Sequence, residues 1–233
     1  MKKLVVFTGA GISAESGLST FRDNGGLWDN YDINEVATPE AWAANPKLVL
    51  DFYNMRRKNA FDAQPNFAHE SIAELEDFFD VHVITQNIDN LHERGGSANV
   101  LHLHGEVDKV RSVGTGLVYD HGDMPLNYGD LCPDGFQLRP HIVWFGEPVP
   151  NLEIADDIVR TADLFIVAGT SLNVYPAAGL VHVAPEKSIK FLVDPSNQLK
   201  IPSIKNLTVY KENATIGIPK IVSQLKEEIL KNQ

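Results

Sequence analysis

The chain has 233 residues and an acidic composition, with 31 Asp and Glu against 20 Lys and Arg and a net charge of -11. This charge repels phosphate groups, so neither nucleic acid nor an anionic membrane is expected as a partner. Hydrophobic residues make up 43% of the chain, which is enough for a folded core. The single cysteine, Cys132, excludes an internal disulfide. The apolar run at 4–7 is too short for a signal-peptide core, and a cytoplasmic location is expected.

Short apolar runs recur along the chain and alternate with helical patterns. The first, at 4–7, runs directly into Gly9-Ala10-Gly11 and predicts a buried strand that ends in a glycine turn. Strands are also predicted at 81–85, 100–103, 142–145, 164–168, 189–193 and 207–210, and helices at 46–60, 67–79, 151–162 and 218–230. This alternation predicts an α/β fold, with a Rossmann-like parallel sheet and helices on both faces.

Two segments interrupt the alternation and predict a second, smaller unit. Residues 34–61 have a helical pattern without strands, and 107–138 is rich in Gly, Asp and short apolar pieces. We expect these two segments to form a small subdomain. The remaining segments, 1–33, 62–106 and 139–233, are expected to form the Rossmann-like domain.

The glycine turn after the first strand matches a dinucleotide-binding pattern. Gly9, Gly11 and Ala14 fit G-x-G-x-x-G/A, in which glycines let the backbone approach a pyrophosphate and the N–H groups of a following helix bind its charge. The alternative is a tight turn that binds no ligand. The segment at 19–28 is typical of a loop, not of a second strand with a terminal acidic residue, so an ordinary dehydrogenase is disfavoured.

Five ordered motifs carry a family resemblance. They are GAGISAESGLSTFRDNGGLW at 9–28, TQNIDNLHERGG at 85–96, LHLHGE at 101–106, RPHIVWFGE at 139–147 and GTSLNVYPAA at 169–178. Together they resemble the sirtuin family, especially its short bacterial members with a Tyr-x-x-Arg signature. The resemblance implies an NAD-dependent protein-lysine deacylase that acts on acylated-lysine proteins or peptides. Its products would be nicotinamide, O-acyl-ADP-ribose and the free lysine.

The resemblance assigns the catalytic roles to His104, Asn87 and Asp89. His104 matches the family's general base, and an imidazole that titrates near physiological pH suits this task. Asn87 and Asp89 match contacts to nicotinamide and ribose, although alone they would be interpreted as helix caps. His102 and His104 share one face of an extended segment, so a metal-binding pair is an alternative.

The positions that the resemblance assigns to NAD lie in the glycine segment, the QNID group, the GTS group and two later positions. They are Gly9, Ala10, Gly11, Ser13, Ala14, Phe21, Arg22, Trp28, Gln86, Asn87, Ile88, Asp89, Gly169, Thr170, Ser171, Asp194 and Ala214. Leu192 departs from the family, because many sirtuins carry Asn there to contact the adenosine ribose. Asp194, Ser196 or Asn197 could compensate for it.

The substrate positions fall into two groups. Val143, Trp144, Phe145 and Val174 match the stretches between which sirtuins receive the substrate backbone as an added strand, although apolar core is an equally compatible interpretation. Tyr53 and Arg56 match the Tyr-x-x-Arg signature and share one face of a predicted helix. A guanidinium and a phenol can bind the carboxylate of a succinyl or malonyl group, so desuccinylation or demalonylation is expected beside deacetylation. On sequence alone, the segment is typical of a solvated helix face.

The small subdomain lacks the cysteines with which most sirtuins bind zinc. Within 107–138 the chain has only Cys132, and Ser112 stands where the first ligand is expected, so no zinc is predicted. We expect a hydrophobic cluster to hold the subdomain instead. Its candidate members are Val113, Leu117, Val118, Tyr119, Leu126, Tyr128, Leu131 and Phe136.

Other functions are compatible with parts of this pattern. A mono-ADP-ribosyltransferase or an NAD hydrolase would share the first chemical step. A non-catalytic NAD or ADP-ribose sensor would need the glycine and GTS segments alone. His104 and the TQNID group favour the deacylase, because a sensor has no need of a base.

Overall fold

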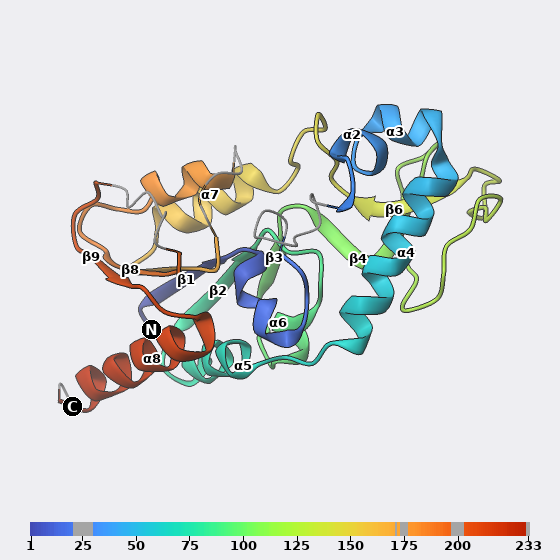
Figure 1. Ribbon diagram of the computed structural model, residues 1–233. Helices are drawn as coiled ribbons and strands as arrows, with labels where there is room; N and C mark the ends of the chain where they lie inside the picture. The colour runs from blue at the N-terminus through green and yellow to red at the C-terminus, as the bar shows by residue number, and fades with distance from the viewer. Residues whose placement is uncertain (21–29, 171, 173–176, 197–202, 232–233) are drawn as a thin grey trace.

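The computed structural model describes residues 1–20, 30–170, 172, 177–196 and 203–231 (Figure 1). Its main sheet has six parallel strands in the order β3-β2-β1-β7-β8-β9. The strands are β1 (Lys3–Thr8), β2 (Asp80–Thr85), β3 (Val100–His102), β7 (Leu164–Ala168), β8 (Ile189–Val193) and β9 (Leu207–Tyr210). The parallel sheet and its flanking helices confirm the predicted α/β class.

Helices cover both faces of this sheet, as Figure 1 shows. In β1, Leu4 and Val6 belong to a core cluster with α5 (Phe67–Ala73) and α8 (Ala214–Lys231). Val5 and Phe7 point the other way, into a cluster with α7 (Leu152–Arg160) and the 3-10 helix η4 (Ala177–His182). A strand buried on both faces has a continuous apolar run, which is why the sequence pattern identified β1.

A second, antiparallel sheet lies beside the first, with strand order β5-β4-β6. Its strands are β4 (Gly105–Ser112), β5 (Val118–Asp120) and β6 (Leu138–Ile142). The helices near it are α2 (Ile33–Val36), α3 (Pro39–Ala44) and α4 (Pro46–Asp62), while α6 (Leu91–Arg94) and η3 (Glu74–Asp77) belong with the main sheet. We refer to residues 105–142 as the small module.

Helix α4 is bonded to the small module through two of its polar side chains. The helix begins at Pro46, after Asn45 accepts a hydrogen bond from the Leu48 N–H. Arg57 is fully buried and donates from Nε to the Val107 oxygen at 2.8 Å. Asn54 donates to the Leu126 oxygen and accepts from the Leu126 N–H, both at 2.9 Å. These bonds satisfy main-chain groups that a buried loop would otherwise leave unpaired.

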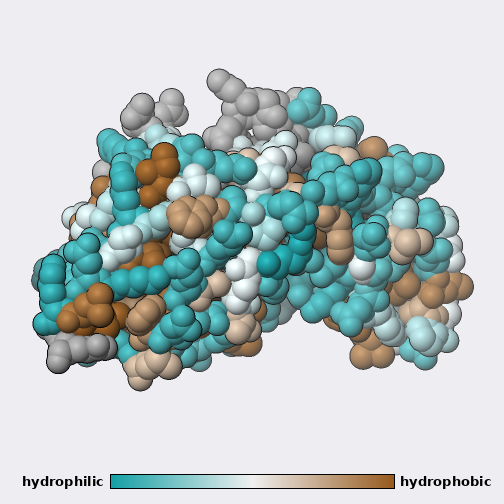
Figure 2. Space-filling model, turned by 90° about the horizontal axis from the view of Figure 1, so that it is seen from below, coloured by the Kyte–Doolittle hydropathy of each residue, from teal (hydrophilic) through white to brown (hydrophobic). Residues whose placement is uncertain are grey.

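The predicted hydrophobic cluster of the small module is wrong. Leu126 is buried and Tyr119 partly buried, but the other six candidates are each at least 45% exposed. Figure 2 shows apolar side chains at the surface of this end of the molecule. Polar bonds hold the loops instead: the Gln137 amide donates to the Asn127, Asp130 and Leu138 oxygens at 2.8–3.2 Å.

The strand predicted at 142–145 is also wrong, because β6 ends at Ile142 and the apolar residues that follow leave the sheet.

Within the described residues, the structure contains no helix long and apolar enough to cross a membrane. The same part of the chain holds no cluster of three or more His, Cys, Asp or Glu side chains suited to a metal ion.

Candidate active site

A cavity of roughly 580 Å³ lies where the carboxyl ends of the parallel strands face helix α4 and the loop after β6. Crevices at this edge of an open α/β sheet are the usual ligand sites of such folds. The predicted site residues on its wall are Gly9, Ala10, Gly11, Ala14, Tyr53, Arg56, Gln86, Asn87, Ile88, His104, Val143, Trp144, Phe145, Gly169, Thr170, Asp194 and Ala214. The fold therefore brings together both the cofactor positions and the substrate positions.

The glycine segment after β1 packs directly against the end of β7. A Cβ on Gly11 would lie 2.7 Å from the Gly169 Cα, and one on Gly169 would lie 2.2 Å from the Ile12 nitrogen. Gly169 also has a φ of 62°, which favours glycine. The segment continues as two 3-10 turns, η1 (Ala10–Ile12) and η2 (Ala14–Ser16), and the α-helix expected here is not formed.

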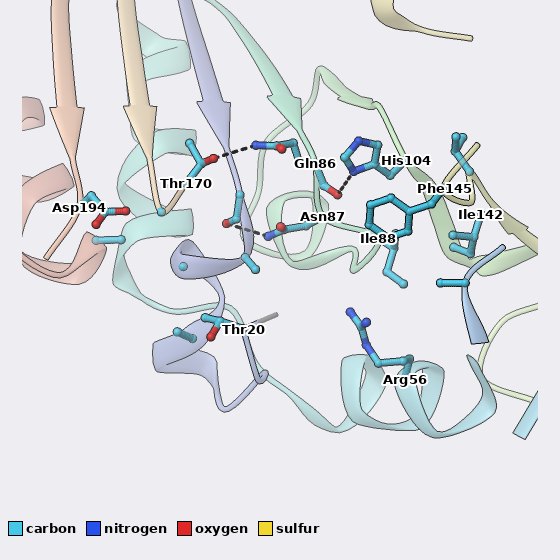
Figure 3. A pocket seen from close by; sticks show the side chains of 18 of the residues that line it. Thr20, Arg56, Gln86, Asn87, Ile88, His104, Ile142, Phe145, Thr170 and Asp194 are labelled. Carbon is cyan, nitrogen blue, oxygen red and sulfur yellow. Dashed lines mark hydrogen bonds between the residues drawn. The ribbon is translucent and has the colours of Figure 1, made fainter. Parts of the chain in front are cut away.

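Gln86 connects the end of β2 to two other parts of the wall (Figure 3). Its side chain donates to the Thr170 hydroxyl at 3.1 Å. Its main-chain oxygen lies 2.9 Å from Nδ1 of His104. Because a carbonyl oxygen can only accept, Nδ1 of His104 carries the proton of this bond.

This bond fixes the chemical state of His104. A neutral imidazole with its proton on Nδ1 has a free lone pair on Nε2, and the ring lines the cavity. Burial lowers the pKa of His104, although the bond to the Gln86 oxygen opposes this effect. The side chain is therefore neutral near physiological pH and can accept a proton.

His102 makes a similar bond, to the main-chain oxygen of the residue after Gln86. Its Nδ1 donates to the Asn87 oxygen at 2.9 Å, and its Nε2 lies 2.8 Å from a carboxylate oxygen of Glu93. Burial disfavours the charged ring, but the bond and charge of Glu93 raise the pKa of His102. In each histidine, Nδ1 thus donates a hydrogen bond to a main-chain oxygen. This arrangement does not favour the alternative in which His102 and His104 bind a metal ion.

Asn87, Ser13 and Asp89 form a buried chain of hydrogen bonds. The Asn87 amide donates to the Gly9 oxygen at 3.2 Å and to the Ser13 hydroxyl at 3.1 Å, and that hydroxyl donates to Asp89 at 3.2 Å. Asn87 lies on the cavity wall, whereas Ser13 and Asp89 lie behind it. Asp89 also accepts from the Leu91 N–H, and burial raises the pKa of its carboxyl group.

Tyr53 and Arg56 project from one face of α4 into the opposite side of the cavity. Figure 3 shows the Arg56 guanidinium directed towards Ile88 and Phe145. Burial raises the pKa of Tyr53 to about 12, against the influence of the Arg56 charge. Burial lowers the pKa of Arg56, while Tyr53 and Asp89 oppose that shift. Both side chains therefore act as hydrogen-bond donors here, and α4 is not simply a solvated face.

Glu147 fixes the loop that follows β6. Its carboxylate accepts from Arg139 at 2.8 Å, from Arg111 at 3.0 Å and from the Trp144 main-chain N–H at 2.8 Å. The Arg139 guanidinium stacks on the Trp144 ring, with its carbon 3.3 Å from the ring centroid. Burial opposes the charge of Glu147, but the bonds from Arg139 and Trp144 lower its pKa.

The far end of the cavity is formed by residues after β8 and at the start of α8. Asp194, Ser196 and Ala214 line it, while Leu192 is buried in the sheet core. Glu15 connects this end to the glycine segment, because its carboxylate accepts from the Thr215 N–H and hydroxyl. Asp194 and Ser196 are thus placed where they could replace the polar contact that Leu192 lacks.

Some predicted positions lie outside the described residues, and some wall residues were not predicted. Phe21, Arg22, Trp28, Ser171, Val174 and Asn197 belong to the first group. The second group contains Glu15, Thr20, Ala37, Phe52, Ile142, Gly146, Glu147, Val149, Val193, Pro195 and Asn213. Glu15 and Glu147 stand inside the recognised motifs, so their motif membership was a usable signal.

Comparison with known proteins assigns the family. The sequence pattern described as the Sir2 family matches residues 9–176. A protein of Bacteroides thetaiotaomicron named NAD-dependent protein deacylase is 51% identical over 227 residues, which cover 95% of this chain and 97% of that protein. A Helicobacter pylori protein of the same name is 49% identical over 237 residues, which cover 99% of this chain and 100% of that protein.

A solved structure agrees with the sequence comparison. A mutant Sir2 homologue in complex with ADP-ribose superposes with a TM-score of 0.90 at 38% identity, and the match covers 98% of this chain and 93% of that one. Motif order, fold and overall likeness lead to the same conclusion. The chain belongs to the Sir2 family.

Proposed function

We propose that this chain removes acyl groups from protein lysine side chains in an NAD-dependent reaction. In this proposal His104 is the base, and Tyr53 and Arg56 bind acidic acyl groups. The activity, NAD-dependent protein deacylation, is that of relatives at about half identity over nearly the whole chain. It is the activity of this chain as well. The roles of the individual residues, and the preference among acyl groups, are the proposal.

The chemistry of the cavity fits NAD. Gly9 and Gly11 line the cavity, and neither position has room for a side chain, because a Cβ there would lie within 2.9 Å of Gly169 or Thr170. A bare main chain can approach phosphate groups closely. At the far end, Asp194 and Ser196 offer polar groups suited to ribose hydroxyls. When bound, NAD supplies a ribose carbon whose nicotinamide can leave and a hydroxyl that can receive the acyl group.

The residues of the chain provide orientation and proton transfer. His104 would accept the hydroxyl proton at Nε2, since Nδ1 is committed to the Gln86 oxygen. The amides of Gln86 and Asn87 would orient the carboxamide and the sugar, and their own bonds to Thr170 and Ser13 restrict their rotation. Asp89, behind the wall, would hold Ser13 and thus Asn87 in place.

Tyr53 and Arg56 support a preference for dicarboxylic acyl groups. A guanidinium and a protonated phenol on the cavity wall favour a carboxylate at the end of the acyl chain. Val143, Trp144 and Phe145 line the same cavity as this pair and His104, which supports the proposal that they contact the substrate backbone. An acetyl group offers no carboxylate to either donor, so we expect it to be the poorer substrate.

One observation carries the proposal: His104, oriented by the Gln86 oxygen, shares a cavity with Tyr53 and Arg56. Transfer of ADP-ribose to another nucleophile, and simple hydrolysis of NAD, are not favoured, because the named relatives are deacylases. An NAD sensor has no use for a neutral, oriented imidazole.

The test uses NAD with acetyl-, succinyl- and malonyl-lysine peptides, with nicotinamide and acylated ADP-ribose followed by mass spectrometry. We expect acyl transfer with every peptide and higher kcat/KM with the two acidic groups. Nicotinamide release without peptide would indicate hydrolysis and overturn the proposed function. Equal kcat/KM for acetyl and succinyl peptides would overturn the acyl preference alone.

A further inference from the structure

Asn87 is held through its main chain as well as through its side chain. Its side-chain amide lies on the cavity wall and donates to the Gly9 oxygen and the Ser13 hydroxyl. Its main-chain N–H donates to the Thr85 hydroxyl at 3.0 Å, and its main-chain oxygen accepts from Nδ1 of His102 at 2.9 Å. The place of the Asn87 amide in the cavity therefore depends on two side chains that hold its backbone.

The bond at the Asn87 N–H continues into the interior of the protein. The Thr85 hydroxyl is hydrogen-bonded at 2.9 Å to the hydroxyl of Thr8, its partner on the neighbouring strand β1. The Thr8 hydroxyl is hydrogen-bonded in turn to Nε2 of His92 at 3.0 Å. Thr8 and Thr85 are fully buried, His92 is 1% exposed, and none of the three lines the cavity. His92 thus ends a buried chain of hydrogen bonds that begins at Asn87, and bonds shielded from water strengthen one another.

His92 is fixed at the end of this chain. It lies in the short helix α6, and the ring of His69 packs against its own ring at 4.9 Å, centroid to centroid. Burial, and the neighbouring His69 and His102, lower the pKa of His92 well below 6.5. Its Nδ1 has no partner within the described residues, and a charged ring would need a proton there, as a buried donor without an acceptor. The ring is therefore neutral, and its bond to the rest of the protein is the one at Nε2.

We propose that His92 is a positioning residue for the reaction, because through Thr8 and Thr85 it fixes the main chain of Asn87 and so the amide on the cavity wall. The inference rests on the proposed function of the cavity, in which this amide orients the cofactor. His92 does not line the cavity, so it acts on the rate through the chain alone. Orientation is needed chiefly in the transition state, and its loss lowers kcat more than it raises KM.

The first test compares His92→Leu with His92→Gln. Leucine fills similar space without a polar atom, whereas glutamine places an amide near Nε2 that can donate or accept a hydrogen bond. With the acyl-lysine peptide that the wild-type enzyme turns over fastest, we expect His92→Leu to lower kcat about tenfold and His92→Gln about threefold or less. The KM for the peptide should change within about twofold in both variants. Equal losses of kcat in the two variants would overturn the inference.

A double variant shows whether the residues act as one chain. Thr8→Val interrupts the chain at its centre and should lower kcat about tenfold. Combined with His92→Leu it should still lower kcat only about tenfold, because both changes interrupt the same chain. A loss of about a hundredfold, the product of the two single effects, would mean that the residues pack independently and would contradict the inference.

His82→Leu is the matched control for these variants. His82 is a partly buried histidine of β2 that bonds to Asn99 and lies outside the chain. Its replacement should change kcat within about twofold.

A second measurement reports on the chain without any substrate. Hydrogen exchange, followed by NMR, should be about tenfold faster at the Asn87 N–H in His92→Leu than in the wild-type enzyme. The Val83 N–H, which donates to the Asn99 oxygen at 2.9 Å, lies in the same strand and should exchange at an unchanged rate. Equal acceleration at both positions would mean that His92 only stabilises the fold, and an unchanged rate at Asn87 would mean that it does not hold this residue. Either result overturns the inference.

The two measurements separate the inference from the function beneath it. If the wild-type enzyme turns over none of the acyl-lysine peptides, the proposed function fails and the positioning role fails with it, whatever the exchange rates show. If the peptides are turned over and exchange at Asn87 responds to His92→Leu while kcat does not, the function stands and the inference alone is overturned.

Discussion

His102 donates a hydrogen bond from Nδ1 to the Asn87 oxygen at 2.9 Å, one residue along from the Gln86 oxygen that holds His104 at the same distance. Two imidazoles thus fix two consecutive carbonyl groups. Glu93 fixes His102 from the other side through its carboxylate. The segment that carries the Asn87 amide is therefore held by His104, which lines the cavity, and by His102 and Glu93, which do not.

We expect His102→Ala to lower kcat about tenfold, because small displacements of reacting groups are costly in rate. His102→Asn should retain most of the activity, since its amide nitrogen can occupy the place of Nδ1. Steady-state kinetics that separate kcat from the KM for NAD would check this. Equal losses in the Ala and Asn variants would show that the bond to the Asn87 oxygen does not position the site.

The pH dependence of the rate reports on His104. Burial lowers its pKa below 6.5, and the protonated ring has no lone pair to accept a proton. The rate should therefore fall as pH drops through this lowered pKa and be constant above it. Above this pKa, His104→Ala should reduce kcat about 10²–10⁴-fold, and the difference from wild type should shrink as pH falls below it. A kcat profile whose acidic limb has its midpoint above the ordinary histidine pKa would argue against His104 as the base.

Arg56→Met tests the acyl preference without shortening the side chain greatly. It removes a charged donor pair, so kcat/KM for a succinyl peptide should fall about a hundredfold, while that for an acetyl peptide should change within about threefold. Lys58→Met is the matched control, because Lys58 is an exposed cation on the same helix that pairs with Asp62. An equal loss of kcat/KM for the succinyl and acetyl peptides in Arg56→Met would show that Arg56 does not bind the acyl carboxylate.

His69 makes folding stability depend on pH. It is fully buried against His92, and burial lowers its pKa to about 4. The unfolded chain binds a proton below about 6.5 and the folded chain does not, so stability is present above this pH and is lost as pH falls.

His69→Gln isolates this contribution. The glutamine keeps an acceptor for the Asn66 N–H at the start of α5 but does not titrate. From about pH 7 to about pH 5, the wild type should lose on the order of 2 kcal/mol more stability than the variant. Denaturant unfolding at both pH values measures this difference. Equal losses would mean that His69 is protonated in the folded protein.

Asn54 tests how the small module is held. Its side chain makes two bonds to the main chain of Leu126, so Asn54→Ala should lower the free energy of unfolding by about 1–3 kcal/mol. Asn59→Ala, at an exposed position of the same helix, should cost less than about 0.5 kcal/mol. We also expect a chelator to leave both values unchanged. Stoichiometric zinc in the purified protein would contradict that expectation.

Much of the main sheet could be predicted because its strands are buried on both faces. The runs that became β1 and β7 are continuous and apolar, and Lys190 alone interrupts the run that became β8, a pattern typical of strands buried on both faces. In β6 the sequence Leu138–Ile142 contains Arg, Pro and His, so the pattern placed the strand on the apolar residues that follow. Those residues are apolar because they line the cavity.

The wall of the site could be predicted only as far as the motifs reach. Motif membership identified Asn87 and Asp89 alike, but only the structure shows that Asn87 lies on the wall and Asp89 behind it. The small module was mispredicted for a related reason. The prediction assumed that the apolar side chains of this segment pack together. In the structure the Gln137 amide bonds to the loops, and Leu131 and Phe136 are exposed.

Gln86 divides two duties between its main chain and its side chain. The carbonyl oxygen selects the tautomer of the base, and the amide contacts Thr170. Every amino acid has the first group, so a replacement at position 86 would change the cavity wall and leave the acid–base state of His104 as it is. We therefore expect a replacement at position 86 to alter cofactor binding and to leave the proton-transfer chemistry of His104 in place.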